Sequence, residues 1–395
     1  MTALCFICLA LLVLSLMCSK ERLFSPAVIT SGIWFVCVVC FTVFDHGLYP
    51  VSSKFCTALT IWCSCFCISS LSVQSISFKT PYNGIVPSRT MRDIYFYFCI
   101  ATLPLMILQV IAISRSGYQG NMFHLLRMAN VYGIESEGIA RTATFFIPFW
   151  QITYLIELSE YSKQNRGRVC FLALLNIFYI VVSMSKTVFL IFFLSTMFML
   201  LFKKRIAIKH VIIGGICLIF IFFVLQTIRA ISGQEVEFGN FLRLYVLTSI
   251  PAFEMVEPCS SAHWGENSFR FVYAIANRLH LSSIEPIDPV LAWAEVPVPT
   301  NVYTVMYPFY KDFGFVGVGI FAAVSGAIFG WIYKCVEQGS LFAAILYAIL
   351  SICLFMQIMG DIFFTTLSQN IQYILIAILP FFVTKYNLLK RTSYD

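Results

Sequence analysis

Long apolar runs dominate the sequence and limit the folds that it can adopt. Of its 395 residues, 59% are hydrophobic and only 11% are charged. Soluble domains carry about 25% charged residues, so the composition indicates an all-α, polytopic integral membrane protein. About 20 apolar residues in a helix cross a bilayer. Eleven runs of roughly this length predict transmembrane helices: residues 2–18, 25–44, 55–75, 94–113, 142–158, 169–184, 187–202, 211–228, 314–333, 341–358 and 370–384.

A short polar stretch, SMSKT (183–187), divides the apolar sequence between residues 169 and 202. One continuous helix of this length would extend about 51 Å at 1.5 Å per residue. The hydrocarbon core of a bilayer is only about 30 Å thick. We therefore expect the chain to turn at or near SMSKT.

Positive charge is unevenly divided between the two sets of loops. Sixteen of the 26 lysines and arginines fall in the loops of one side, and the other ten are spread over much longer loops. The positive-inside rule makes the first set cytoplasmic. The second set then contains two large outer loops, residues 114–141 and 229–313. We expect one transmembrane domain over residues 1–395, with its function in these outer loops.

Several classes of function are disfavoured by the sequence. The net charge of +7 follows from anchoring cytoplasmic loops and does not indicate nucleic-acid binding. The fifteen cysteines lie mostly inside apolar runs, without zinc-ligand spacing, so we expect no metal and no cofactor. The chain has no Asp-x-Asp pair, P-loop or nucleophile elbow. It also lacks the internal repeat of most secondary transporters.

Arginines on the outer side are candidates for binding an anion. They are Arg115, Arg127, Arg141, Arg229, Arg243, Arg270 and Arg278. The forked guanidinium group can bind phosphate oxygens bidentately, whereas the alternative is that these side chains reach lipid headgroups. Lys186, in the SMSKT turn, either faces a protein cavity or the outer surface, or simply caps the turn.

Acidic and histidine side chains of the long outer loop are candidate proton-transfer groups. They are Glu254, Glu257, His263, Glu266, His280, Glu285, Asp288 and Glu295. We select His280 and Glu254 as candidate catalytic residues, because His280 adjoins Arg278 and a base near a phosphate-binding arginine would suit glycosyl transfer. The alternative for each is an ordinary solvated loop residue.

A polar and aromatic stretch, PTNVYTVMYPFYKDFGFVG (299–317), precedes the ninth apolar run. Tyr303, Tyr307 and Tyr310 are spaced i, i+4 and i+7, so in a helix they would share one face. This face, with Asn301, would either form an interfacial aromatic belt or stack against sugar rings. Asp312 would lie at the start of the following span. Small residues then recur at every fourth position and predict close helix packing: Ala322, Gly326 and Gly330.

Residues 299–333 resemble the late signature of Wzy-type O-antigen polymerases, in which Thr-Asn-x-Tyr precedes Asp-Phe-Gly and a glycine-rich span. The SMSKT turn resembles the Ser-x-Ser-Arg-Thr turn of the same family, with Lys186 in place of the arginine. The segment from Arg127 to Gly138 fits the family's Arg-x10-Gly pattern, whereas Arg229 to Gly239 is one residue short of it.

The resemblance implies a reaction and a location. The protein would lie in the bacterial inner membrane, with a membrane-embedded, glycosyltransferase C-like architecture and an active site facing the periplasm. It would transfer the growing chain from undecaprenyl diphosphate to the non-reducing end of a newly flipped O-unit, without a metal. A chain-length regulator would be its protein partner, and membrane lipid would surround it.

The resemblance also implies roles for particular residues. Arg229, Arg243 and Arg278, with Lys186 and Arg127, would hold the diphosphate. Asn301, Tyr303, Tyr307 and Tyr310 would line the saccharide site. The alternatives are an O-antigen ligase, which uses the same donor and a lipid A-core acceptor, and a flippase for the lipid-linked oligosaccharide.

Overall fold

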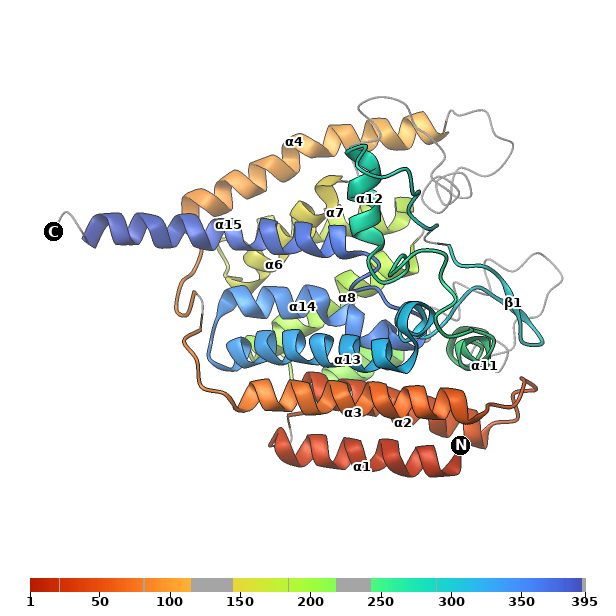
Figure 1. Cartoon of the computed structure of the whole chain (residues 1–395). Helices are drawn as coiled ribbons and strands as arrows, with labels where there is room; N and C mark the ends of the chain where they lie inside the picture. The colour runs from red at the N-terminus through yellow and green to blue at the C-terminus, as the bar shows by residue number, and fades with distance from the viewer. Residues whose placement is uncertain are drawn as a thin grey trace. The chain divides into compact units, whose positions relative to one another are not determined.

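The computed structural model describes residues 1–20, 22–80, 82–114, 145–183, 185–217, 243–288 and 290–392, and it is almost entirely helical (Figure 1). The α-helices are α1 (Thr2–Cys18), α2 (Pro26–Val43), α3 (Ser53–Ser75), α4 (Arg89–Ser114), α6 (Ile147–Ser159), α7 (Arg166–Ser183), α8 (Lys186–Phe202), α11 (Ser249–Glu254), α12 (Arg270–Arg278), α13 (Tyr307–Glu337), α14 (Leu341–Phe355) and α15 (Leu367–Thr392). The described elements also include the π-helix η2 (Arg243–Leu247), the 3-10 helix η3 (Met356–Ile358) and the short strands β1 (Ala294–Glu295) and β2 (Pro299–Thr300).

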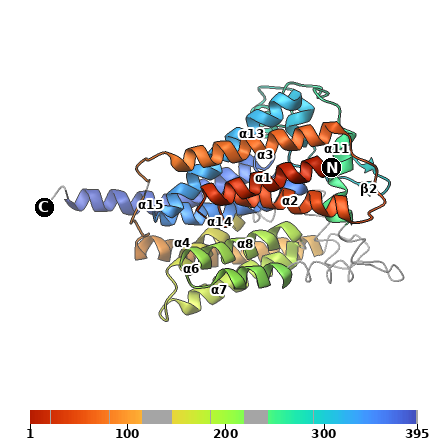
Figure 2. The same cartoon turned by 90° about the horizontal axis from the view of Figure 1, so that it is seen from below.

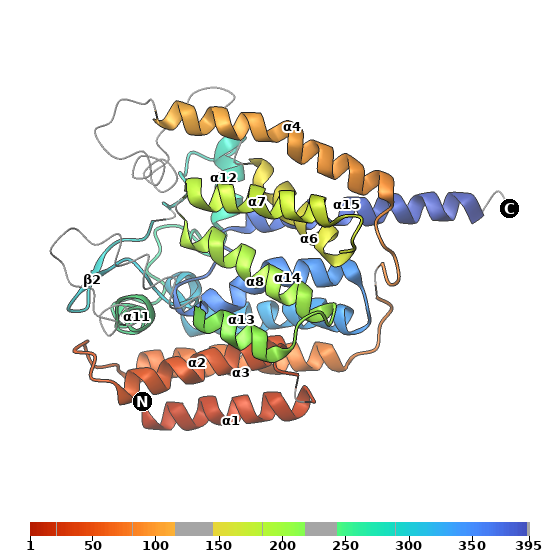
Figure 3. The same ribbon diagram turned by 180° about the vertical axis from the view of Figure 1, so that it is seen from behind.

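Seven of the described helices are long and apolar enough to cross a membrane: α2, α3, α4, α7, α13, α14 and α15. Three further apolar helices, Thr2–Cys18, Lys186–Phe202 and Ile208–Cys217, are shorter. A multi-pass, nearly all-helical membrane protein is therefore confirmed, while the count of eleven spans stays a prediction. The expected turn at SMSKT is also confirmed, because α7 ends at Ser183 and α8 begins at Lys186. The two helices lie side by side (Figure 3).

The chain divides into two compact units, which we describe separately. Unit 1 comprises Met1–Lys79, Gly214–Lys334 and Cys353–Ser368, and unit 2 comprises Thr80–Ile213, Cys335–Ile352 and Gln369–Asp395. Unit 1 contains α1, α2 and α3, which pack side by side (Figure 2), together with nearly all of α13.

Glycines let α13 approach α3 closely within unit 1. A Cβ atom on Gly326 would lie 2.3 Å from the Phe66 carbonyl oxygen, and one on Gly330 would lie 2.6 Å from the Ser70 carbonyl oxygen. The Ser69 hydroxyl donates a 2.7 Å hydrogen bond to the Ala323 carbonyl across the same contact. The predicted role of the small residues in close helix packing is confirmed.

One glutamine organises the core of unit 1. Both indole N–H groups, of Trp34 and Trp62, donate to Gln357 Oε1, at 3.1 and 3.0 Å. Gln357 Nε2 donates to the Thr30 hydroxyl at 2.9 Å, and its carbonyl accepts from Val305 N at 2.8 Å. Because these groups are buried, each needs a partner. The network thereby fixes the segment just before α13 against α2 and α3.

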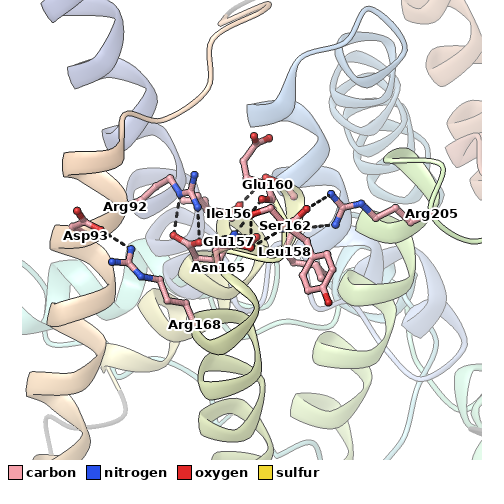
Figure 4. A network of polar contacts seen from close by, with 12 residues as sticks. Arg92, Asp93, Ile156, Glu157, Leu158, Glu160, Ser162, Asn165, Arg168 and Arg205 are labelled. Carbon is pink, nitrogen blue, oxygen red and sulfur yellow. Dashed lines mark hydrogen bonds and ion pairs between the residues drawn. The ribbon is translucent and has the colours of Figure 1, made fainter.

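Hydrogen bonds and an ion pair connect loops of unit 2 to one another (Figure 4). The fully buried Glu157 carboxylate accepts two hydrogen bonds from Arg92, at 2.9 and 2.6 Å, and one from Asn165 at 3.0 Å. Arg205 donates to the carbonyl oxygens of Leu158 and Tyr161. These contacts join three loops that the charge pattern assigns to one side of the membrane.

Candidate functional site

The stretch 299–313 forms a folded frame at one end of unit 1. Strand β2 pairs antiparallel with β1, and the Thr300 hydroxyl lies 3.3 Å from the Thr248 hydroxyl. Tyr303 donates its phenolic hydrogen to the Ala292 carbonyl at 3.1 Å. Asn301 is half-buried between these anchored residues. The frame thus fixes the backbone on both sides of Asn301.

The three tyrosines do not share one helical face, so that prediction is wrong. Helix α13 begins only at Tyr307, and Tyr303 precedes it in irregular structure. The Tyr303 and Tyr307 rings still lie 4.5 Å apart between centroids. Tyr310 instead packs against Phe253, at 5.0 Å. All three tyrosines are buried, which leaves little of their surface for a sugar to contact. Burial, with a smaller effect of Tyr307, raises the pKa of the Tyr303 hydroxyl.

Asp312 lies inside α13, which starts five residues earlier, and just before the kink at Gly314 that separates the first turns of α13 from its longer second part. Its carboxylate accepts from the side-chain amide of Asn267 at 2.8 Å, from Ser268 N at 2.7 Å and from the Ser261 hydroxyl. It therefore binds the preceding loop to α13. Gly314 kinks the helix two residues later, with φ 61° and ψ −149°. This conformation is open essentially to glycine alone.

The two candidate catalytic residues occupy different local environments. The Glu254 carboxylate accepts from Ser52 N at 3.1 Å, from the Ser52 hydroxyl at 2.7 Å and from Phe55 N at 3.0 Å. It thereby satisfies free N–H groups at the start of α3. His280 is exposed and has a positive φ of 56° just beyond α12, where its N–H bonds to the Asn277 carbonyl. His280 and Glu254 each have a structural role at the end of a helix.

The predicted diphosphate-binding residues are not all described. Arg127 and Arg229 lie outside the described residues. Arg278 is exposed in the last turn of α12, and Arg243 begins η2, both in unit 1. Lys186 is the first residue of α8, in unit 2, where the hydroxyl of Ser185 caps the helix by accepting from Val188 N.

Two half-buried arginines of unit 1 donate to neutral oxygens. Arg243 Nη1 donates to the His46 carbonyl at 3.5 Å, and Arg270 Nε donates to the Ile287 carbonyl at 2.7 Å. Among the described residues, neither forms a salt bridge. Burial lowers the pKa of Arg270, an effect that the nearby Asp288 partly offsets. A guanidinium group has five N–H donors, so these contacts with the described residues leave further donors for an anion.

Sequence reasoning missed two buried polar residues near this frame. One is Gln357; the other is Asp361, whose carboxylate accepts from the N–H groups of Phe363, Phe364 and Thr365 at 2.8–3.3 Å. Burial raises the pKa of Asp361 to about 6, although these bonds lower it. The available signal was a lone amide and a lone carboxyl inside a mostly apolar stretch.

Because comparisons with known proteins found no match, the class of this protein is assigned from its structure. The chain matched no family model, no curated protein and no solved structure. Within the described part of the chain, no three His, Cys, Asp or Glu side chains are grouped as a metal site would require. The fold defines a multi-pass, nearly all-helical membrane protein, in which unit 1 contains the frame of residues 299–313 and the half-buried Arg243 and Arg270.

Proposed function

We propose that this protein is an O-antigen polymerase of the inner membrane, acting at the periplasmic face. The bond between the growing saccharide and undecaprenyl diphosphate breaks, and a new glycosidic bond forms to a hydroxyl of the incoming O-unit. The hydroxyl proton passes to a base, and undecaprenyl diphosphate leaves. Negative charge develops on the departing diphosphate while the bond breaks, so cationic hydrogen-bond donors near the diphosphate lower the activation barrier of the transfer.

The observation that carries the proposal is the link between Arg243 and the motif that resembles the polymerases. Arg243 opens η2, and Thr248, which follows η2 directly, contacts Thr300 of the motif through their hydroxyl groups. A half-buried guanidinium that donates to a neutral carbonyl is therefore coupled to the frame around Asn301. This arrangement would suit a diphosphate beside a saccharide.

Separate loops support the same end of unit 1. Arg243 bonds to the loop that follows α2, and the same loop reaches Glu254 through Ser52. The charge pattern assigns both segments to the outer side. A substrate at this end would therefore meet residues from three stretches of the sequence, which would help to orient its reacting groups.

The test is the lipopolysaccharide ladder of cells that carry Arg243→Ala or Arg229→Ala in place of the normal protein. We expect the ladder to collapse to core plus one repeat unit, with the protein still present in the membrane. Arg166→Ala is the matched control, because Arg166 is exposed at the start of α7 in unit 2. It should leave the ladder unchanged.

The same gel separates the alternative functions. In cells with the gene deleted, loss of a ligase would leave core alone while lipid-linked polymer accumulates. Loss of a flippase would leave no O-unit at the surface. Either pattern would contradict the proposed polymerase. A normal ladder with Arg243→Ala at normal protein levels would contradict only the diphosphate-binding role.

A further inference from the structure

Three polar side chains of helix α12 (Arg270–Arg278) bond to backbone oxygens of the loops on either side of it. Arg270 Nε donates to the Ile287 carbonyl at 2.7 Å, and Asn277 Nδ2 donates to the Ile284 carbonyl at 3.3 Å. The Tyr273 hydroxyl donates to the Trp264 carbonyl at 2.6 Å. The polar face of this helix is thus held by backbone oxygens of its own outer segment.

The apolar side chains of α12 point outward instead. Val272, Ile275 and Leu279 are spaced i, i+3 and i+7 and are 57, 42 and 61% exposed. None of the helix residues is buried. A surface helix in water normally has the opposite arrangement, with its apolar face towards the core. The reversed arrangement predicts an apolar medium outside the helix.

Trp264 links the residue that precedes α12 to α13. Its indole is 75% exposed, and its ring lies 5.5 Å from Phe269 and 5.2 Å from Phe313 between centroids. Beyond Phe313, α13 exposes Val316 and Ile320 one turn apart, as a lipid-facing span does. Exposed apolar side chains are therefore present on the membrane-spanning α13, at Trp264 and on α12.

The direction of α12 agrees with an apolar medium outside it. In Figure 1 it runs across the direction of α2, α3 and α13, which belong to the same unit. A helix that crosses the spanning helices in this way runs along the membrane plane. Tryptophan is enriched at the membrane interface, and arginine side chains there reach lipid phosphates. Trp264 and Arg278 suit those two positions.

We propose that α12 and Trp264 form a membrane-docking element in the outer leaflet. Val272, Ile275 and Leu279 contact the acyl chains, and the exposed Arg278 contacts lipid phosphates. The occupant of this surface is lipid, because the apolar face of the helix is exposed and the helix is linked through Phe269 and Trp264 to a membrane-spanning helix. The inference is independent of the proposed polymerase activity.

The experiment places a photo-crosslinking amino acid at Val272, Ile275 or Leu279 of the full chain. Each variant is irradiated in nanodiscs of phosphatidylethanolamine and phosphatidylglycerol, and adducts are counted by intact mass spectrometry. The controls are Ala274, on another face of α12, and the exposed Glu285. Three independent positions keep the test valid if one variant fails to fold.

We expect lipid adducts at the three apolar positions at least tenfold more often than at either control. Equal labelling at test and control positions would overturn the proposal. The variants are also irradiated in intact cells, where we again expect lipid adducts. Adducts there mainly with another protein would overturn it too, since they would assign the surface to a protein partner.

Discussion

Replacing Gln357 by leucine should destabilise unit 1 strongly. The substitution removes the oxygen that accepts from the buried indoles of Trp34 and Trp62. It leaves the backbone bond from Val305 in place. A buried donor without an acceptor costs about 1–3 kcal/mol, so the two indole groups together should cost about 2–6 kcal/mol.

The measurement is the free energy of unfolding of the full chain in detergent, followed by intrinsic tryptophan fluorescence. Gln164→Leu is the control, because Gln164 is exposed in a loop of unit 2 and should change little. The reasoning is refuted if Gln357→Leu unfolds at the same denaturant concentration as Gln164→Leu.

Two further predictions concern helix packing and pH. Gly326→Ala should destabilise the protein by about 1–3 kcal/mol, because the new Cβ would meet the Phe66 carbonyl. Gly167→Ala should instead stabilise α7 by about 0.5–1 kcal/mol, because a Cβ there would meet open space. Thermal unfolding in detergent compares the two variants, and equal shifts of the unfolding temperature would contradict the packing argument. The pKa of Asp361 is raised to about 6 in the folded state, so between about pH 4 and 6 the folded state keeps a proton that the unfolded state has lost. The free energy of unfolding should therefore fall as pH rises through that window, by about 3 kcal/mol in total. Above about pH 6 it should stay level. Unfolding measured from pH 4 to 7 should show this fall in the normal protein and not in Asp361→Asn; a fall of the same size in both would exclude Asp361 as its source.

The helices and one helix contact could be predicted from the sequence because their causes are local. Apolar length sets the spans, and the polar SMSKT stretch sets the turn between α7 and α8. Gly326 and Gly330 recur at helical spacing, so their close approach to another helix could be expected, although not that the helix is α3.

The polar contacts could not be predicted because their partners are distant in the sequence. Gln357 bonds to Trp34, 323 residues away, and Glu254 bonds to Ser52, 202 residues away. Composition gives the type of each side chain but not the oxygen or N–H group that it meets. The prediction of a shared tyrosine face was wrong for a related reason. Tyr303 bonds to the distant Ala292 carbonyl and lies outside the helix that begins at Tyr307.

The stretch that resembles the polymerases divides into residues that build the frame and residues that remain open to a ligand. Asp312 is committed to the loop at Asn267 and Ser268, and Gly314 supplies a backbone conformation that a side chain would strain. A carboxylate that already accepts several hydrogen bonds is poorly placed to take a proton from a substrate. Under the proposed function, anion binding falls to the half-buried Arg243, whose contact with the described residues uses one N–H group to bond to the His46 carbonyl. Loss of polymer with normal folding is thus expected at Arg243, whereas changes at Asp312 or Gly314 should lower the amount of folded protein first.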